Sequence, residues 1–204
     1  MCVLVSPRQL HDSISQSLYE KIIIHFATRF ETTVAKVRKY YRPDMVEQWS
    51  KVRRLGGGDD MKASSMDIDP EDKRDATFVR YDMLIDVNTR YKRRKAVFQP
   101  KAFYGQLQHI FVVRFPATRA LKHYNDETYI LAYIHTCEGM TYENGLEMPY
   151  YTYLGGREVV DMGCVQCLVG RIKLSDGWWA IVDRSGEIQR AYYTGDDGVT
   201  EAAE

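Results

Sequence analysis

Four side chains in the second half of the chain have the types and the paired spacing of zinc ligands. They are His135, Cys137, Cys164 and Cys167. Zinc deaminases use a related pattern, His-x-Glu followed by Pro-Cys-x-x-Cys, in which the zinc ion activates a water molecule. Here a cysteine occupies the position of the glutamate, which follows one residue later as Glu138, and Gly163 replaces the proline. The deaminase pattern therefore fails in its details.

The segment around the two later cysteines has the residue pattern of a strand. Side chains three residues apart on a strand point to opposite faces, so Cys164 and Cys167 would need a turn between them to bind one ion. Because free cysteine behaves as a small hydrophobe, we expect these thiols to be buried, reduced and structural. The sequence predicts no metal, no other cofactor and no catalytic residues. A zinc-dependent enzyme or zinc-stabilised fold is the less favoured hypothesis.

The placement of charge is more informative than its total. The chain has 28 Lys+Arg and 28 Asp+Glu, yet residues 87–125 contain nine basic residues and no acidic one. Cations beside exposed aromatic rings suit phosphate contact and base stacking. The candidate nucleic-acid-binding residues are Arg90, Tyr91, Lys92, Arg93, Arg94, Lys95, Lys101 and Tyr104. The alternative is a solvated loop whose aromatic residues belong to the core.

The leading hypothesis is a non-enzymatic module that binds nucleic acid or chromatin through residues 87–101. Zero net charge argues against tight non-specific binding by the whole molecule, although it leaves room for a local basic edge. The second hypothesis is an interaction or assembly module that docks on a protein partner through an amphipathic helix. The docking residues of that helix would be Leu10, Ile14, Leu18, Ile22 and Phe26.

These residues belong to a first segment, 1–56, that the sequence predicts to be helical. Apolar residues recur at every fourth position from Leu10 to Phe30, as on one face of a helix. Thr32 or Thr33 would cap a second helix. A third helix would begin at Pro43, run through Trp49 and end at the glycines of 56–58.

The rest of the chain has the character of a β domain. We expect a polar linker over 57–77, a β-rich domain over 78–195 and an acidic tail over 196–204. Segments rich in β-branched and aromatic residues cover 78–85, 103–115, 128–136, 159–173 and 178–183. The clearest hairpin turns at Asp176 and Gly177. The predicted fold class is α+β, with N-terminal helices followed by a small antiparallel β-barrel or curled sheet.

The sequence shows neither a signal peptide nor an apolar run long enough to cross a bilayer. We therefore expect a nuclear or cytoplasmic protein that is not secreted and has no membrane partner.

Five strings along the chain are recognisable together. They are WSKVRRL at 49–55, RDATFVRY at 74–81, FYGQLQHIF at 103–111, EVVDMGCVQCLVGR at 158–171 and WAIVDRSG at 179–186. In this order they resemble the C-terminal region of transposon-derived proteins of mushroom-forming fungi, of the Kyakuja–Dileera–Zisupton type. The string at 103–111 also looks like a β module downstream of the transposase in plant mobile elements. The resemblance implies a β-rich nuclear accessory module, with the transposase core upstream in a longer parent protein.

Overall fold

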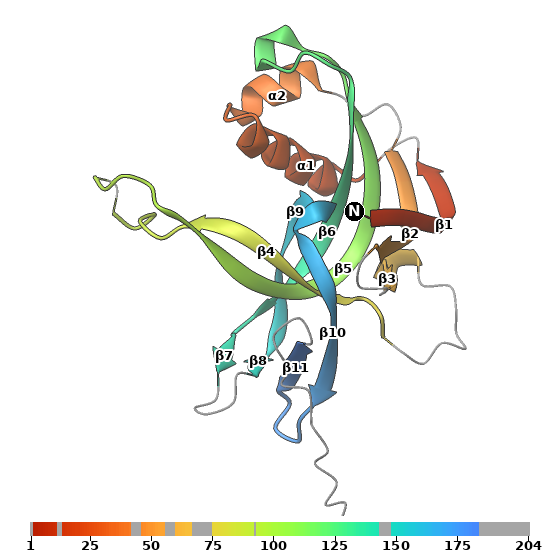
Figure 1. Ribbon diagram of the computed structural model, residues 1–204, viewed down its shortest axis with the longest axis vertical. Coiled ribbons are helices and arrows are strands. Elements are labelled where there is room, and N and C mark those ends of the chain that lie inside the picture. The colour runs from red at the N-terminus through yellow and green to blue at the C-terminus, as the bar shows by residue number, and fades with distance from the viewer. Residues whose placement is uncertain are drawn as a thin grey trace, which may run out of the picture.

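The computed structural model describes residues 2–11, 14–41, 46–55, 60–66, 75–91, 93–142 and 148–183. In these residues the chain forms a mostly antiparallel β-sheet with two short α-helices (Figure 1). The helices are α1 (Gln16–Arg29) and α2 (Val34–Tyr40). The strands are β1 (Cys2–His11), β2 (Val46–Arg54), β3 (Asp60–Lys62), β4 (Phe78–Asp86), β5 (Phe98–Phe115), β6 (Glu127–Glu138), β7 (Thr141–Tyr142), β8 (Pro149–Tyr151), β9 (Tyr153–Asp161), β10 (Val165–Lys173) and β11 (Trp179–Asp183). Single 3-10 turns cover Ser64–Met66, Arg119–Leu121 and Met162–Cys164.

The sheet is organised around β5, which is 18 residues long. One edge of β5 pairs with β6, which in turn pairs with β9. The other edge pairs with β4 along its first half and with β2 near its end. From β4 the sheet continues through β10, β11, β8 and β7, and from β2 it continues to β1 and β3. It does not close into a barrel.

The predicted fold class, α+β with N-terminal helices before a small barrel or curled sheet, is therefore wrong. Leu10 lies in β1 and pairs with Glu47, and Trp49 lies in β2. Burial along β2 alternates with a period of two residues: Val46 and Gln48 are buried on one face. Residues four positions apart share one face of a helix. They also share one face of a strand, because every second residue of a strand points to the same side. The regular spacing from Leu10 therefore did not separate a strand from the helix that follows it.

The two α-helices that do form begin at side-chain caps. The Ser15 hydroxyl accepts a hydrogen bond from the Leu18 amide, 3.3 Å away, and Thr33 caps α2 by accepting from the Lys36 amide. The predicted threonine cap is thus confirmed. The predicted start of the third helix, Pro43, lies outside the described residues.

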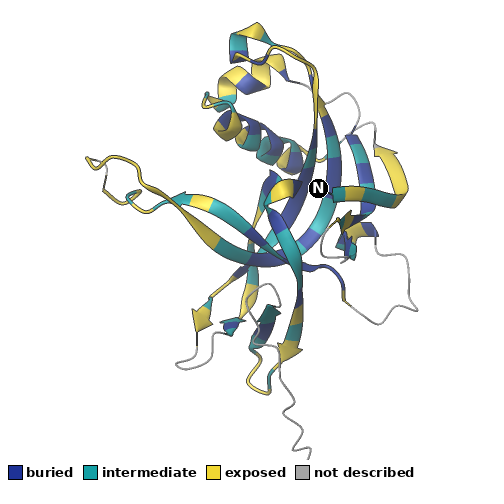
Figure 2. Ribbon diagram, viewed as in Figure 1, coloured by how far each residue is buried: buried dark blue, intermediate teal, exposed yellow. Residues whose placement is uncertain are grey.

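The helices cover one face of the sheet, and a second core fills the other. On β6, Leu131 and Tyr133 pack in the core beneath the helices, whereas Ala132 and Ile134 belong to the second core. Figure 2 shows the buried residues along the middle of the sheet and the inner side of α1. The alternation along β6 follows from the two-residue period of a strand, so one strand supplies both cores.

The predicted β segments from residue 78 onward overlap observed strands, although β5 begins earlier than predicted and the segment 159–173 is divided between β9 and β10 by a 3-10 turn. The hairpin predicted at Asp176 and Gly177 joins β10 to β11, and Gly177 adopts a φ of +90°, which glycine tolerates. Within the predicted linker, the described residues 60–66 supply β3 and a 3-10 turn. The predicted tail, 196–204, lies outside the described residues.

Candidate nucleic-acid interface

The outer parts of β4 and β5 form a two-stranded ribbon that leaves the sheet. Residues 82–86 of β4 pair with 98–102 of β5. Over these residues no further described strand pairs with either one, because β10 contacts β4 only at 79–81 and β6 joins β5 from Gly105 onward. Figure 1 shows this ribbon projecting away from the helices and from the rest of the sheet. We call residues 82–102 the arm.

The loop at the end of the arm is built by side-chain hydrogen bonds. The Oδ1 atom of Asp86 accepts from the backbone amides of Asn88 and Val97, each at 2.9 Å. The side-chain amide of Asn88 donates to the Lys95 carbonyl at 2.7 Å. The backbone amide of Val87 donates to the Val97 carbonyl at 3.0 Å. These bonds close the loop on itself and hold its cations at the end of the ribbon.

The described cations of the arm form no ion pair with another described residue. Arg90, Arg93, Arg94, Lys95 and Lys101 are exposed. None of them forms an ion pair with another residue that the structure describes. The two acids of the arm are engaged elsewhere, since Asp86 accepts from the loop amides and Asp82 pairs with Arg80 at 3.0 Å. The positive charge of the arm is therefore available to an anion.

Most of the predicted binding residues come together on the arm. Tyr91 lies in the loop, where the guanidinium carbon of Arg94 is 4.5 Å from its ring centroid. Lys101 lies on the ribbon, with its Nζ atom 5.3 Å from the ring centroid of Phe103. Lys92 lies outside the described residues.

Tyr104 is the predicted binding residue that the structure separates from the others. Its side chain lies in a buried cluster with Phe78 and Ile181, and the residue is only 8% exposed. Its hydroxyl donates to Asp183 at 2.9 Å, and burial together with that carboxylate raises the pKa of the phenol. Tyr104 therefore stabilises the sheet and does not offer its ring for stacking on a base.

The two most exposed apolar side chains of the arm are not among the predicted binding residues. Leu84 is 69% exposed and Phe98 is 63% exposed. Large apolar residues gathered on a projecting element mark a contact surface more often than isolated ones do. Phe98 stands three residues after Lys95, at the end of the cationic run.

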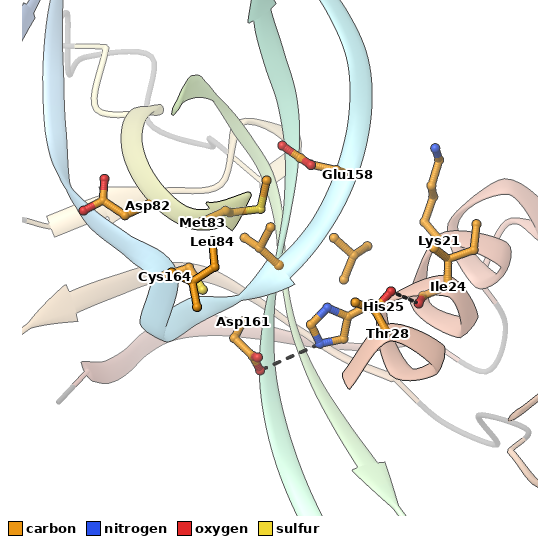
Figure 3. A pocket seen from close by; sticks show the side chains of 12 residues that line it. Lys21, Ile24, His25, Thr28, Asp82, Met83, Leu84, Glu158, Asp161 and Cys164 are labelled. Atoms are coloured by element: carbon orange, nitrogen blue, oxygen red, sulfur yellow. Dashed lines mark hydrogen bonds and ion pairs between the residues drawn. The ribbon is translucent and has the colours of Figure 1, made fainter. Parts of the chain in front are cut away.

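A cleft of about 500 Å³ lies between α1, β4 and β9, beside the base of the arm (Figure 3). His25 of α1 faces Asp161 of β9, with Nε2 and Oδ1 3.8 Å apart, and Arg29 forms an ion pair with the same carboxylate. Burial lowers the pKa of His25, an effect that Asp161 opposes and Arg29 reinforces. Burial also raises the pKa of the Cys164 thiol, which keeps it protonated and weakly nucleophilic at neutral pH.

The four candidate zinc ligands lie in different surroundings. Cys137 is buried in one core cluster, against which the partly buried Cys167 packs, while Cys164 packs against another. Burial raises the pKa of Cys137 to about 12. The Nε2 atom of His135 lies 3.0 Å from the Gly155 carbonyl. Among the described residues, no three histidine, cysteine or acidic side chains converge as a metal site.

The predicted docking face of the first helix packs against the chain's own sheet. Leu18, Ile22 and Phe26 of α1 are buried beneath β5 and β6, and Ile14 packs at the edge of the same core. Leu10 lies outside this helix, exposed on β1. Because the apolar face is already covered, it gives no support to the assembly hypothesis.

No helix in the described parts of the chain has both the length and the hydropathy required to span a bilayer. Comparisons with protein-family models, curated proteins and solved structures find no match. The likeness to transposon-derived proteins therefore stays a prediction.

Proposed function

We propose that this protein is a non-enzymatic module that binds nucleic acid through its arm, as an accessory part of a mobile-element-derived protein that acts on chromatin. One observation carries this proposal. Five described basic residues between positions 90 and 101 lie on a projecting ribbon, and its two acids, Asp82 and Asp86, are already engaged. Nucleic-acid phosphates are the anions that such a cationic ribbon fits best.

The projection of the arm explains how a chain of zero net charge could bind a polyanion. Five residue pairs separate the loop from the body of the sheet, which corresponds to about 15 Å at the rise of a β-strand. The Debye length is about 8 Å at physiological ionic strength, so acidic groups on the body are largely screened at the end of the arm. A phosphate at the loop therefore meets mainly the local positive charge.

The test is the salt dependence of binding after three loop charges are removed. In the variant Arg93→Gln/Arg94→Gln/Lys95→Gln, affinity for fluorescently labelled DNA and RNA should fall. The slope of log affinity against log salt should become shallower by about 2 to 3, because each lost phosphate contact removes about one released counterion. Fluorescence anisotropy between about 50 and 200 mM salt measures both quantities.

A matched variant removes the same number of exposed charges away from the arm. Lys36→Gln/Lys39→Gln/Arg119→Gln alters α2 and the turn after β5, both outside the arm. It should bind like the wild type. If the loop variant also keeps the affinity and salt slope of the wild type, the arm is not a nucleic-acid-binding site.

A further inference from the structure

Three exposed residues of the arm, Leu84, Phe98 and Pro100, lie on one face of its ribbon. Leu84 pairs with Pro100, and Asp86 pairs with Phe98. Cross-strand partners and alternate residues of a ribbon share a face, so Leu84, Phe98 and Pro100 form an apolar surface beside Asp86, whose carboxylate accepts from the loop amides. We call these three residues the wedge. The cationic loop begins immediately beyond it.

The free edge of β5 is protected against pairing with another strand. Pro100 lacks the amide that a further strand would need, and Lys101 places a charge at the same edge. Both features are typical devices against strand addition. Pairing with a further strand along the β5 edge is therefore disfavoured, and it does not account for the exposed wedge.

We propose that the wedge inserts between base pairs of a DNA duplex from the minor groove, while the loop cations hold the flanking phosphates, so that the protein bends DNA. This inference rests on the proposed nucleic-acid-binding function. Minor-groove proteins combine basic side chains with apolar wedges of phenylalanine, leucine or proline, which partly unstack a base step and kink the duplex. The arm carries both components on one ribbon.

The chemistry of the wedge favours a duplex over a single strand. Single-strand binding relies on several aromatic rings on which successive bases stack. The wedge has one ring, that of Phe98, beside the aliphatic side chains of Leu84 and Pro100. The ring of Tyr91 is already covered on one face by Arg94. Aliphatic groups cannot stack as a base does, but they can fill the gap opened in a kinked step.

The test measures bending and binding separately. A duplex of about 30 base pairs with a central TA step, which kinks readily, carries a donor and an acceptor fluorophore at its ends. Saturating wild-type protein should increase energy transfer between the ends. Phe98→Ala should lose this increase while keeping the salt slope of the wild type, because the loop cations are unchanged. Phe98→Leu should restore most of the increase.

A matched control removes an equally exposed aromatic side chain outside the arm. Tyr124 is 70% exposed in the turn region after β5, and Tyr124→Ala should bend the duplex like the wild type. Since Phe98 is exposed, Phe98→Ala should also keep the melting temperature of the wild type in circular dichroism.

Three results would overturn the wedge while leaving the proposed function standing. They are wild-type binding without increased energy transfer, equal bending by Phe98→Ala, and single-stranded DNA bound more tightly than the duplex. Phe98-dependent binding to vesicles of phosphatidylserine and phosphatidylcholine, without bending of DNA, would assign the wedge to a membrane and overturn it as well. If no nucleic acid binds in a way that depends on the loop charges, both proposals fail together.

Discussion

Asp86 joins the two ends of the cationic loop, because its Oδ1 atom accepts a hydrogen bond from the backbone amide of Val97, eleven residues further along the chain. The same atom accepts from the amide of Asn88. The acid nearest to the basic run thus shapes the loop and is not free to neutralise an arginine. Asp86 therefore links the start and the end of a loop of like charges.

Replacing Asp86 should loosen the loop without unfolding the sheet. In Asp86→Ala, the amides of Asn88 and Val97 lose their acceptor, and their hydrogen exchange should become about tenfold faster or more, as expected for the loss of a hydrogen bond to a charged group. Asp86→Asn keeps an oxygen acceptor and should retain most of the protection. Exchange measured by NMR checks this, and wild-type rates in Asp86→Ala would contradict it.

The arm also shows what sequence patterns could and could not predict. Its first strand was predicted at 78–85 because β-branched and aromatic residues cluster there, and its charge was visible in the sequence. Its second strand was not predicted, because the predicted segment began at residue 103, whereas β5 begins at Phe98. Phe98 and Tyr104 lie an even number of residues apart on β5, so alternation assigns both to the same face. One is exposed and the other buried, because the surrounding strands cover β5 only near Tyr104. The register of the strands and the points where they end decide which side chain is buried, and the local sequence does not show either.

In the N-terminal segment, too, the local sequence predicts only part of the structure. Its helix α1 was predictable from the apolar spacing, since Leu18, Ile22 and Phe26 do form the buried face. The strands β1 and β2 were not predictable, because their partner strands are distant in the sequence. Gln48 of β2, for example, pairs with Phe111 of β5. Pairing across such a separation stabilises a strand whose own residues are compatible with a helix.

Phe26 should be among the most important residues for stability. Its ring contacts those of Phe30, Tyr41, Phe115 and Tyr129, with centroids 4.7 to 5.7 Å apart. Phe26→Ala should lower the free energy of unfolding by about 3–5 kcal/mol in urea denaturation. Ile24→Ala, on the exposed face of the same helix, should cost less than about 1 kcal/mol. Equal losses in the two variants would mean that α1 does not pack on the sheet through Phe26.

The contribution of Arg171 to stability should depend on the planar shape of its guanidinium as well as on its charge. Its central carbon lies 3.3 Å from the ring centroid of Phe78 and 4.5 Å from that of Trp179, and its nitrogens donate to Tyr151 and Asp75. Lysine keeps the charge but cannot stack and bond in two directions at once. Arg171→Lys should therefore lower the free energy of unfolding by about 1–3 kcal/mol. An unchanged unfolding midpoint would show that charge alone suffices.

The stability of the fold should fall as the solution becomes mildly acidic, because of His25. Its side chain is 12% exposed, and Lys21, Asp82, Glu158 and Asp161 line the same cleft. Burial lowers its pKa in the folded protein below the unfolded value of about 6.5. Between the two pKa values, His25 therefore binds a proton in the unfolded chain but not in the folded chain. Stability is fully present above about pH 6.5 and declines as the pH falls toward the folded pKa.

Two variants separate this effect from that of the other four histidines. His25→Gln should flatten the decline in melting temperature between about pH 7 and pH 5.5 relative to the wild type. Asp161→Asn removes the carboxylate that raises the pKa of His25, so the histidine should titrate at a still lower pH in NMR. The decline in stability should then extend further into the acidic range. A wild-type His25 that titrates above 6.5 would reverse the sign of the whole dependence, because the ion pair with Asp161 would then outweigh burial.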